Sequence, residues 1–183
     1  MNSRLAVAVC MIGLVFSPAI AQQFLPKGSI FGGVRVGLGA KENAFDIGVD
    51  GEYVLTGKDE AGPGIVNIGV SLDFSRYSKQ VADSGTATKT TIIPITLAGV
   101  YHLSPAMEDS PEIDPYIMAG FAYRFQTVTS DLNSGITLSS SQNDVQLVGG
   151  LGAWYFFTPR LAAHLRIAFA ASFLTVGVVY RFQ

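Results

Sequence analysis

Residues 174–182 read LTVGVVYRF, and their pattern decides the fold class. Alternate positions fall into an apolar set and a mixed set: Leu174, Val176, Val178, Tyr180 and Phe182 in the first, Thr175, Gly177, Val179 and Arg181 in the second. A period of two places each set on one face of a β-strand, whereas a helix needs apolar residues three and four apart. The segment is therefore predicted to be a strand with one apolar and one mixed face.

The same alternation recurs along the chain, between turn-forming clusters such as Thr56-Gly57-Lys58. It predicts eight strands, at residues 29–38, 44–54, 65–75, 91–102, 115–126, 145–157, 160–169 and 174–182. No Ser- or Pro-rich linker divides residues 22–183, so we expect a single all-β domain there. The uncharged stretch 90–107 also raises the alternative of a membrane helix, but Pro94, Gly99 and its β-branched residues favour a strand.

The distribution of charge predicts which face meets which solvent. The apolar face carries no charged residue, while the mixed face carries Arg35, Asp46, Asp50, Glu52, Asp73, Arg124, Arg166 and Arg181. A soluble ligand-binding barrel would cover its exterior with charge, yet the lysines after residue 21 all lie outside the eight predicted strands: Lys27, Lys41, Lys58, Lys79 and Lys89. Apolar-out and polar-in is the pattern of a membrane barrel, and hydrocarbon requires such a sheet to close. We therefore predict an eight-stranded antiparallel up-and-down transmembrane β-barrel.

Aromatic residues at the strand ends suggest how the barrel is oriented. An even strand number puts both termini on one side, expected to be the periplasm. The strands that run toward that side end in one aromatic belt, which consists of Tyr53, Tyr101, Tyr155, Phe157, Tyr180 and Phe182. The strands that run the other way end in a second belt, which consists of Phe74, Tyr123, Phe125 and Phe169. Residues 76–90 and 127–144 are then long outer loops, and 56–64 and 103–114 are turns on the inner side.

The first 21 residues have the features of a cleaved signal peptide. Arg4 provides the positive charge, residues 5–16 the apolar run, and Ala19-Ile20-Ala21 a cleavage site. The apolar run is too short for a membrane-spanning helix, which needs about 20 residues. Cys10 lies inside this leader, so residues 22–183 offer no thiol, and we expect no cofactor or metal. The formal net charge of −2 also gives no basic footprint for nucleic acid.

Three stretches resemble the outer-membrane β-barrel domain family, the small eight-stranded porin-like and opacity-like proteins, over roughly residues 24–183. They are 93–103, 115–121 and 175–182, which are similar to the family's fourth, fifth and closing strands. The resemblance implies the cell outer membrane as location, its lipids as surroundings, and the barrel-assembly machinery as a partner during insertion. In the closing strand Gly177, Tyr180 and Phe182 match the assembly signal, although Gln183 follows the phenylalanine that usually ends the chain.

The eight charged residues of the mixed face form four arginines and four carboxylates. A buried charge needs a partner, so our hypothesis is that they interlock as a structural plug in the lumen. The alternative is a gate or ion path. His102 and His164 fall on the same face toward the inner strand ends, with no converging partners that would indicate a metal or catalytic site.

We expect a non-enzymatic outer-membrane barrel with a role in envelope structure, surface interaction or limited passage of small apolar solutes. One alternative is a lipid A-modifying enzyme, suggested by the His-x-Ser spacing in His102-Leu103-Ser104, but Pro105 stands where such enzymes have an asparagine. Another is adhesin-like binding to a host surface through the polar residues 127–144. The same scaffold hosts all of these roles.

Overall fold

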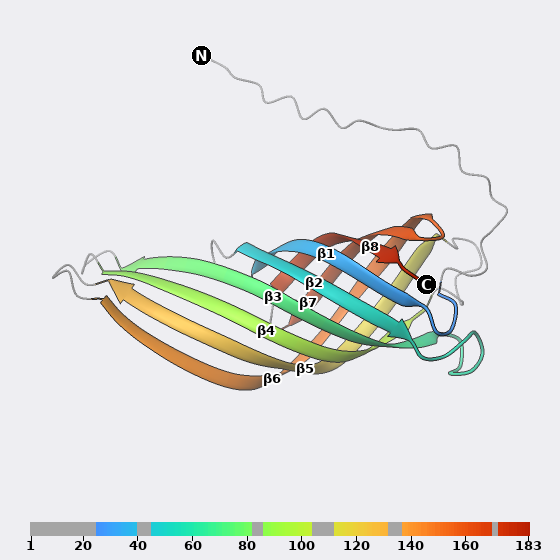
Figure 1. Cartoon of the computed structure of the whole chain (residues 1–183), viewed down its shortest axis with the longest axis horizontal. Coiled ribbons are helices and arrows are strands. Elements are labelled where there is room, and N and C mark those ends of the chain that lie inside the picture. Colours follow the sequence, from blue (N-terminus) through green and yellow to red (C-terminus); the bar gives the residue numbers. More distant parts are fainter. Residues whose placement is uncertain (1–24, 40–44, 82–85, 104–111, 132–136, 170–171) are drawn as a thin grey trace, which may run out of the picture.

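The computed structural model describes residues 25–39, 45–81, 86–103, 112–131, 137–169 and 172–183. The expected leader and Cys10 lie outside these residues. The strands are β1 Ile30–Gly39, β2 Phe45–Val54, β3 Ile65–Val81, β4 Thr86–His102, β5 Ile113–Asp131, β6 Thr137–Thr158, β7 Leu161–Phe169 and β8 Ser172–Arg181. Each pairs antiparallel with the next, and β1 pairs with β8, so the sheet closes into a barrel (Figure 1). The predicted fold is confirmed.

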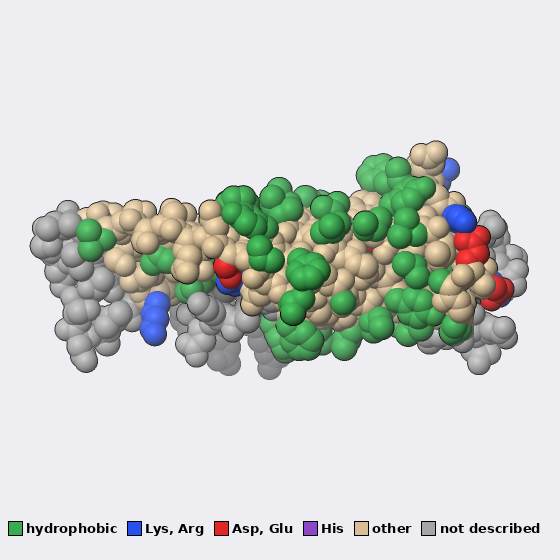
Figure 2. All heavy atoms as spheres, turned by 90° about the horizontal axis from the view of Figure 1, so that it is seen from below, with side chains coloured by type: hydrophobic (Ala, Val, Ile, Leu, Met, Phe, Trp, Pro, Cys, Tyr) green, Lys and Arg blue, Asp and Glu red, His purple; other side chains and the backbone are tan. Residues whose placement is uncertain are grey.

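The apolar face of the strands points outward, as predicted. Large hydrophobic side chains on every strand are exposed, among them Val34, Val49, Leu97, Leu147 and Val178. Figure 2 shows hydrophobic side chains gathered over one part of the barrel's length, followed by a stretch in which polar side chains and backbone prevail. Among the described residues no helix is long and apolar enough to cross a membrane. Outward-pointing apolar side chains are stable when the surrounding medium is hydrocarbon.

Two of the predicted loops are wrong. Most of residues 76–90 belongs to β3 and β4, which continue to Val81 and begin again at Thr86, and most of residues 127–144 belongs to β5 and β6. Lys79 and Lys89 therefore lie inside strands, contrary to the prediction. The strands lengthen because the hairpins keep their register: Arg76 pairs with Thr91 and Lys79 with Thr88, and in the next hairpin Asp131 pairs with Thr137.

These longer strands form a four-stranded sheet that projects from one end of the barrel (Figure 1). We call residues 77–81, 86–90, 126–131 and 137–143 the projecting sheet. It lies at the end of the barrel away from the end of β8 (Figure 1). Strand β4 pairs with β5 up to Ala87 and Asp131, so the two hairpins form one continuous sheet.

Candidate functional site

Arg35 is the centre of a buried ion cluster in the lumen. Its Nη1 donates to Asp50 Oδ1 and its Nη2 donates to Asp73 Oδ1, which joins β1, β2 and β3. The side chains of Arg35 and Asp73 are 1% and 2% exposed, and that of Asp50 is 8% exposed. A guanidinium bonded to two carboxylates satisfies charges that would be costly if left alone in the interior. Three of the predicted lumen residues therefore meet.

Glycine provides the space beside this arginine. A Cβ at Gly177 of β8 would lie 2.4 Å from the carbonyl oxygen of Val34 and 2.8 Å from Cβ of Arg35. Any larger residue would push β1 away from β8 or displace Arg35. Gly177, which the family resemblance associates with barrel assembly, therefore also has a local packing role at the β1–β8 closure.

A second buried cluster surrounds His102 at the end of β4. Its Nδ1 lies 2.6 Å from Asp114 Oδ2, and its Nε2 lies 3.1 Å from Glu52 Oε2. Asn67 Nδ2 donates to the same Glu52 oxygen at 3.1 Å. Because both ring nitrogens face carboxylate oxygens, a doubly protonated imidazole satisfies both carboxylates. Glu52 thus meets His102 and Asp114, and the sequence prediction missed Asp114, which lies before the predicted fifth strand.

Aromatic side chains fill the lumen at the same end. The rings of Phe31 and Trp154 are 5.1 Å apart, and Phe156 packs at 6.0 Å from Trp154. Tyr116 Oη lies 2.6 Å from His164 Nε2, beside the same tryptophan. Phe31, Trp154, Phe156 and Tyr116 are each at most 3% exposed. This inward aromatic cluster was not predicted, because its residues lie on the mixed face, where apolar and polar side chains give no regular pattern.

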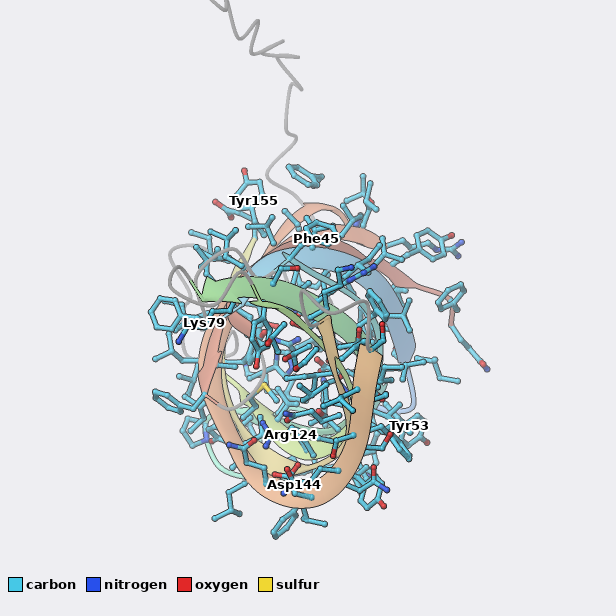
Figure 3. The ribbon with its side chains drawn as sticks, turned by 90° about the vertical axis from the view of Figure 1, so that its left-hand side faces the viewer. Phe45, Tyr53, Lys79, Arg124, Asp144 and Tyr155 are labelled. Atoms are coloured by element: carbon cyan, nitrogen blue, oxygen red, sulfur yellow. The ribbon has the colours of Figure 1, made fainter. Side chains whose placement is uncertain are left out.

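Arg124 forms a separate pair toward the projecting sheet. Its Nε and Nη2 donate to the two carboxylate oxygens of Asp144 at 3.0 and 2.5 Å. The two residues are register partners on β5 and β6, and both lie at the wall in the end-on view of Figure 3. In the same view Tyr53 and Tyr155 point away from the barrel. Asp144 was not in the predicted set, since it fell in a predicted loop.

The remaining predicted residues are spread along the lumen wall. Arg166 of β7 places Nη1 3.9 Å from Met118 Sδ. Asp46 is 1% exposed in β2, and Arg181 is half-buried at the end of β8, where it pairs in register with Phe31. The eight charged residues are therefore divided among several contacts along the barrel and do not converge on one centre.

Little free space remains between these groups. Two small cavities lie beside Arg166, with free volumes of about 20 and about 10 Å³. Such volumes hold one or two water molecules at most, since about 10–15 Å³ is the minimum for one. Among the residues that the structure describes, no group of three or more His, Cys, Asp or Glu side chains is arranged to hold a metal ion. Around Arg166 the described lumen therefore has room for little more than water.

The model of the outer membrane protein beta-barrel domain family matches residues 7–182. The chain belongs to this family. As an outer-membrane barrel it has its outward apolar face in lipid, and the charged side chains of the inner face, such as Arg35 and Asp73, lie in the lumen. No curated protein matches the chain.

Several solved outer-membrane barrels are similar to this one. The N-terminal β-barrel domain of Pseudomonas aeruginosa OprF has a TM-score of 0.52 and 20% identity, covering 85% of this chain and 98% of that one. The attachment invasion locus protein Ail of Yersinia pestis has a TM-score of 0.48 and 13% identity, covering 84% and 95%. Neisserial surface protein A has a TM-score of 0.48 and 18% identity, covering 84% and 95%. At these identities the likeness concerns the fold alone.

The projecting sheet of this outer-membrane barrel is polar on both faces. Residues 137–143 are all exposed, and most are Ser, Thr, Gln or Asn. The hydroxyls of Thr88 and Ser130 lie 3.3 Å apart across β4 and β5. A sheet of this composition is stable in water and would be costly in hydrocarbon. It therefore lies outside the lipid, beyond the apolar band.

Proposed function

We propose that this outer-membrane barrel is a non-conducting, non-enzymatic scaffold that presents the projecting sheet at the cell surface for contact with other molecules. The observation that carries the proposal is the combination of a closely packed lumen around Arg166 with a long polar sheet that, among the described residues, projects from one end of the barrel. Strand pairing that continues far beyond the apolar band adds nothing to membrane anchoring. It does hold a polar surface rigidly away from the lipid headgroups.

The packing of the lumen argues against passage of solutes. A solute would have to pass the Arg35 cluster and then the aromatic cluster around Trp154. Opening the first would separate buried ion pairs, at a cost of about 3–5 kcal/mol for each charge left alone. Limited passage of small apolar compounds is therefore the less favoured role.

The position of His102 argues against a lipid A-modifying enzyme. Its side chain is fully buried and both ring nitrogens are occupied by carboxylates. A general base must reach a substrate proton within hydrogen-bonding distance, directly or through one water. Ser104, the other member of the His-x-Ser spacing, lies outside the described residues. We therefore place His102 among the structural groups.

The proposal includes an orientation and an assembly route. With both termini in the periplasm, the projecting sheet faces the exterior of the cell, because it lies at the other end of the barrel from the finish of β8. The closing strand, with Gly177, Tyr180 and Phe182, serves as the signal to the barrel-assembly machinery. Tyr180 and Phe182 are both outward and exposed, with rings 5.3 Å apart, which makes them available for recognition before insertion is complete.

The role in surface contact is tested by removing the projecting sheet. In the variant, residues 77–90 and 126–142 are each replaced by Asn-Gly, a pair that favours two-residue hairpin turns and here keeps Arg76 opposite Thr91 and Phe125 opposite Asn143. Heat-modifiable migration in a detergent gel checks that the barrel still folds. We expect the variant to lose binding to cultured animal cells that the complete protein shows. Equal binding by both proteins would contradict the proposal.

The closed lumen is tested separately by single-channel recording in planar lipid bilayers. The complete barrel should give no steady conductance. Arg35→Ala, which removes the centre of the ion cluster but leaves the aromatic cluster, should remain closed as well. Large, charge-selective steps from the unmodified protein would show that the lumen is a pore.

A further inference from the structure

We propose that the free edge of β6, residues 138–148, binds an extended polypeptide segment of a partner protein through backbone hydrogen bonds. The inference rests on the proposed surface role of the projecting sheet and names the class of partner and the place where it binds. The partner strand would extend the sheet at this edge.

The edge is free because β6 is much longer than its neighbour β7. Strand β7 pairs with β6 only from Gly149 onward. On its other side β6 pairs with β5 from Thr137 to Tyr155. Over residues 138–148, within the described part of the chain, β6 is therefore paired on one side only. Alternate residues direct N–H and C=O groups away from the sheet at a repeat of about 6.8 Å, which an extended polypeptide matches.

The opposite edge of the projecting sheet is protected, and this one is not. Strand β2 pairs with β3 as far as Arg76, which leaves only residues 77–81 without it. Lys79 is exposed on that short edge, and charged residues on short edges discourage pairing with other chains. Residues 138–148 contain no lysine or proline, and their single charged residue, Asp144, is bonded to Arg124.

The side chains along this edge indicate what kind of segment fits. Residues 138–143 are exposed and mostly polar, whereas Val145 and Leu147 are apolar and 65% and 72% exposed. The edge thus passes from a polar region into the apolar band. Unpaired backbone groups are most costly near hydrocarbon. Hydrogen bonds to a partner strand therefore stabilise the edge most at the Val145–Leu147 end. A complementary segment is polar at one end and apolar at the other.

The chain itself contains a segment of this kind. Residues 120–130, GFAYRFQTVTS, pair with the other edge of the same part of β6, from Gly120 with Val148 to Ser130 with Leu138. Their apolar half lies opposite Val145 and Leu147, and their polar half lies opposite the serines. A synthetic peptide of this sequence is therefore a suitable first probe of the free edge.

The experiment uses the full mature chain in lipid nanodiscs. The probes are the GFAYRFQTVTS peptide and peptides of the same length selected from a displayed random library. Binding is measured by fluorescence anisotropy and amide exchange by NMR. We expect alternate amides of residues 138–148 to exchange fast in the free protein. With peptide bound, the exchange rate of these amides should fall by a factor of about ten or more. N-methylation of alternate peptide residues should abolish binding in one phase of the alternation and not in the other.

A pair of prolines gives the matched test on the protein. The exchange data decide which pair is used, so that the replaced amides are the fast-exchanging ones, whose loss breaks no bond to β5. The variant is either Ser139→Pro with Ser141→Pro or Ser140→Pro with Gln142→Pro. Heat-modifiable migration confirms folding. This variant should lose peptide binding at least about tenfold, since the partner's backbone acceptors lose their donors. Prolines at fast-exchanging residues of 77–81 on the β3 edge are the control and should leave binding unchanged.

Three outcomes would overturn the inference. The first is that neither the β5 peptide nor any library peptide binds. The second is binding that N-methylation does not affect, which would place recognition in side chains. The third is protection of the 138–148 amides before any peptide is added, with a dimeric mass, because the edge would then be an interface between two copies. If the projecting sheet is needed for cell binding but N-methylation has no effect, the proposed function stands and this inference fails.

Discussion

Gly48 of β2 provides the space that the Asp73 carboxylate occupies: a Cβ at position 48 would lie 2.0 Å from Asp73 Oδ1. The two residues are register partners across β2 and β3, and Asp73 in turn accepts a hydrogen bond from Arg35. The smallest residue on one strand thus permits a buried ion pair that links the next strand to β1. Glycine is required here for close approach and not for an unusual backbone angle.

Gly48→Ala should therefore destabilise the barrel. Overpacking of this kind costs about 1–3 kcal/mol, because Asp73 must move away from Arg35. The free energy of unfolding can be measured with urea in lipid vesicles. Gly69→Ala is the matched control on the same inner face, since its Cβ would meet its nearest neighbours at an ordinary 3.4 Å. Equal stability of the two variants would mean that Asp73 is not held where the structure places it.

Arg35→Ala should be much more costly than Arg124→Ala. Removing Arg35 leaves two buried carboxylates without their cation, a loss of about 3–5 kcal/mol. The Arg124–Asp144 pair is more exposed, with side chains at 21% and 38%, so its loss should cost at most about 1 kcal/mol. Urea unfolding of both variants gives the comparison. Similar losses from both would argue against a buried Arg35 cluster.

Trp154 should be inaccessible to lipid. It is the only tryptophan, is 1% exposed, and packs on Phe31 inside the lumen, whereas its neighbour Tyr155 points outward. Brominated lipids should therefore leave its fluorescence nearly unchanged. In the variant Trp154→Phe with Tyr155→Trp the single tryptophan moves to the outer face, and the same lipids should quench it strongly. Strong quenching of the unmodified protein would place residue 154 in lipid and reverse the faces of β6.

Glu60, in the turn between β2 and β3, should titrate at a lower pH than an isolated glutamate. The hydrogen bond from Lys27 Nζ at 2.7 Å, followed by one from the Gly57 amide, holds the pKa of Glu60 below its ordinary 4.5. A lowered pKa means that this contact stabilises the fold above pH 4.5 and is lost as the pH falls through the lower value. NMR titration of the Glu60 carboxyl gives the midpoint.

Substitution of the lysine tests the cause of that shift. Lys27→Ala should raise the pKa of Glu60 toward its ordinary value, because the largest contribution is removed. Lys58→Ala, which removes a lysine from the same turn, should leave the midpoint unchanged. A midpoint that does not respond to Lys27→Ala would show that the segment before β1 is not attached to this turn by the Lys27–Glu60 pair.

Strand positions and the direction of each face followed from local pattern alone. Alternation along 174–182 and its seven counterparts requires only that successive side chains point to opposite faces, which is a property of the extended backbone. The absence of charge on one face then determines the surrounding solvent, because an unpaired charge in hydrocarbon is costly. The barrel, its apolar exterior and its membrane location were therefore accessible from the sequence.

The tertiary structure alone decided how far the strands extend and which charges meet. Residues 76–81 and 137–143 show no alternation of large apolar and polar residues, so the local pattern does not mark them as strands. They are strands because their hairpin partners stay in register. Asp114 and Asp144 meet His102 and Arg124 only after β4, β5 and β6 are aligned. Local pattern reports the solvent that a side chain faces, whereas contacts across strands depend on register and barrel closure, which no single segment encodes.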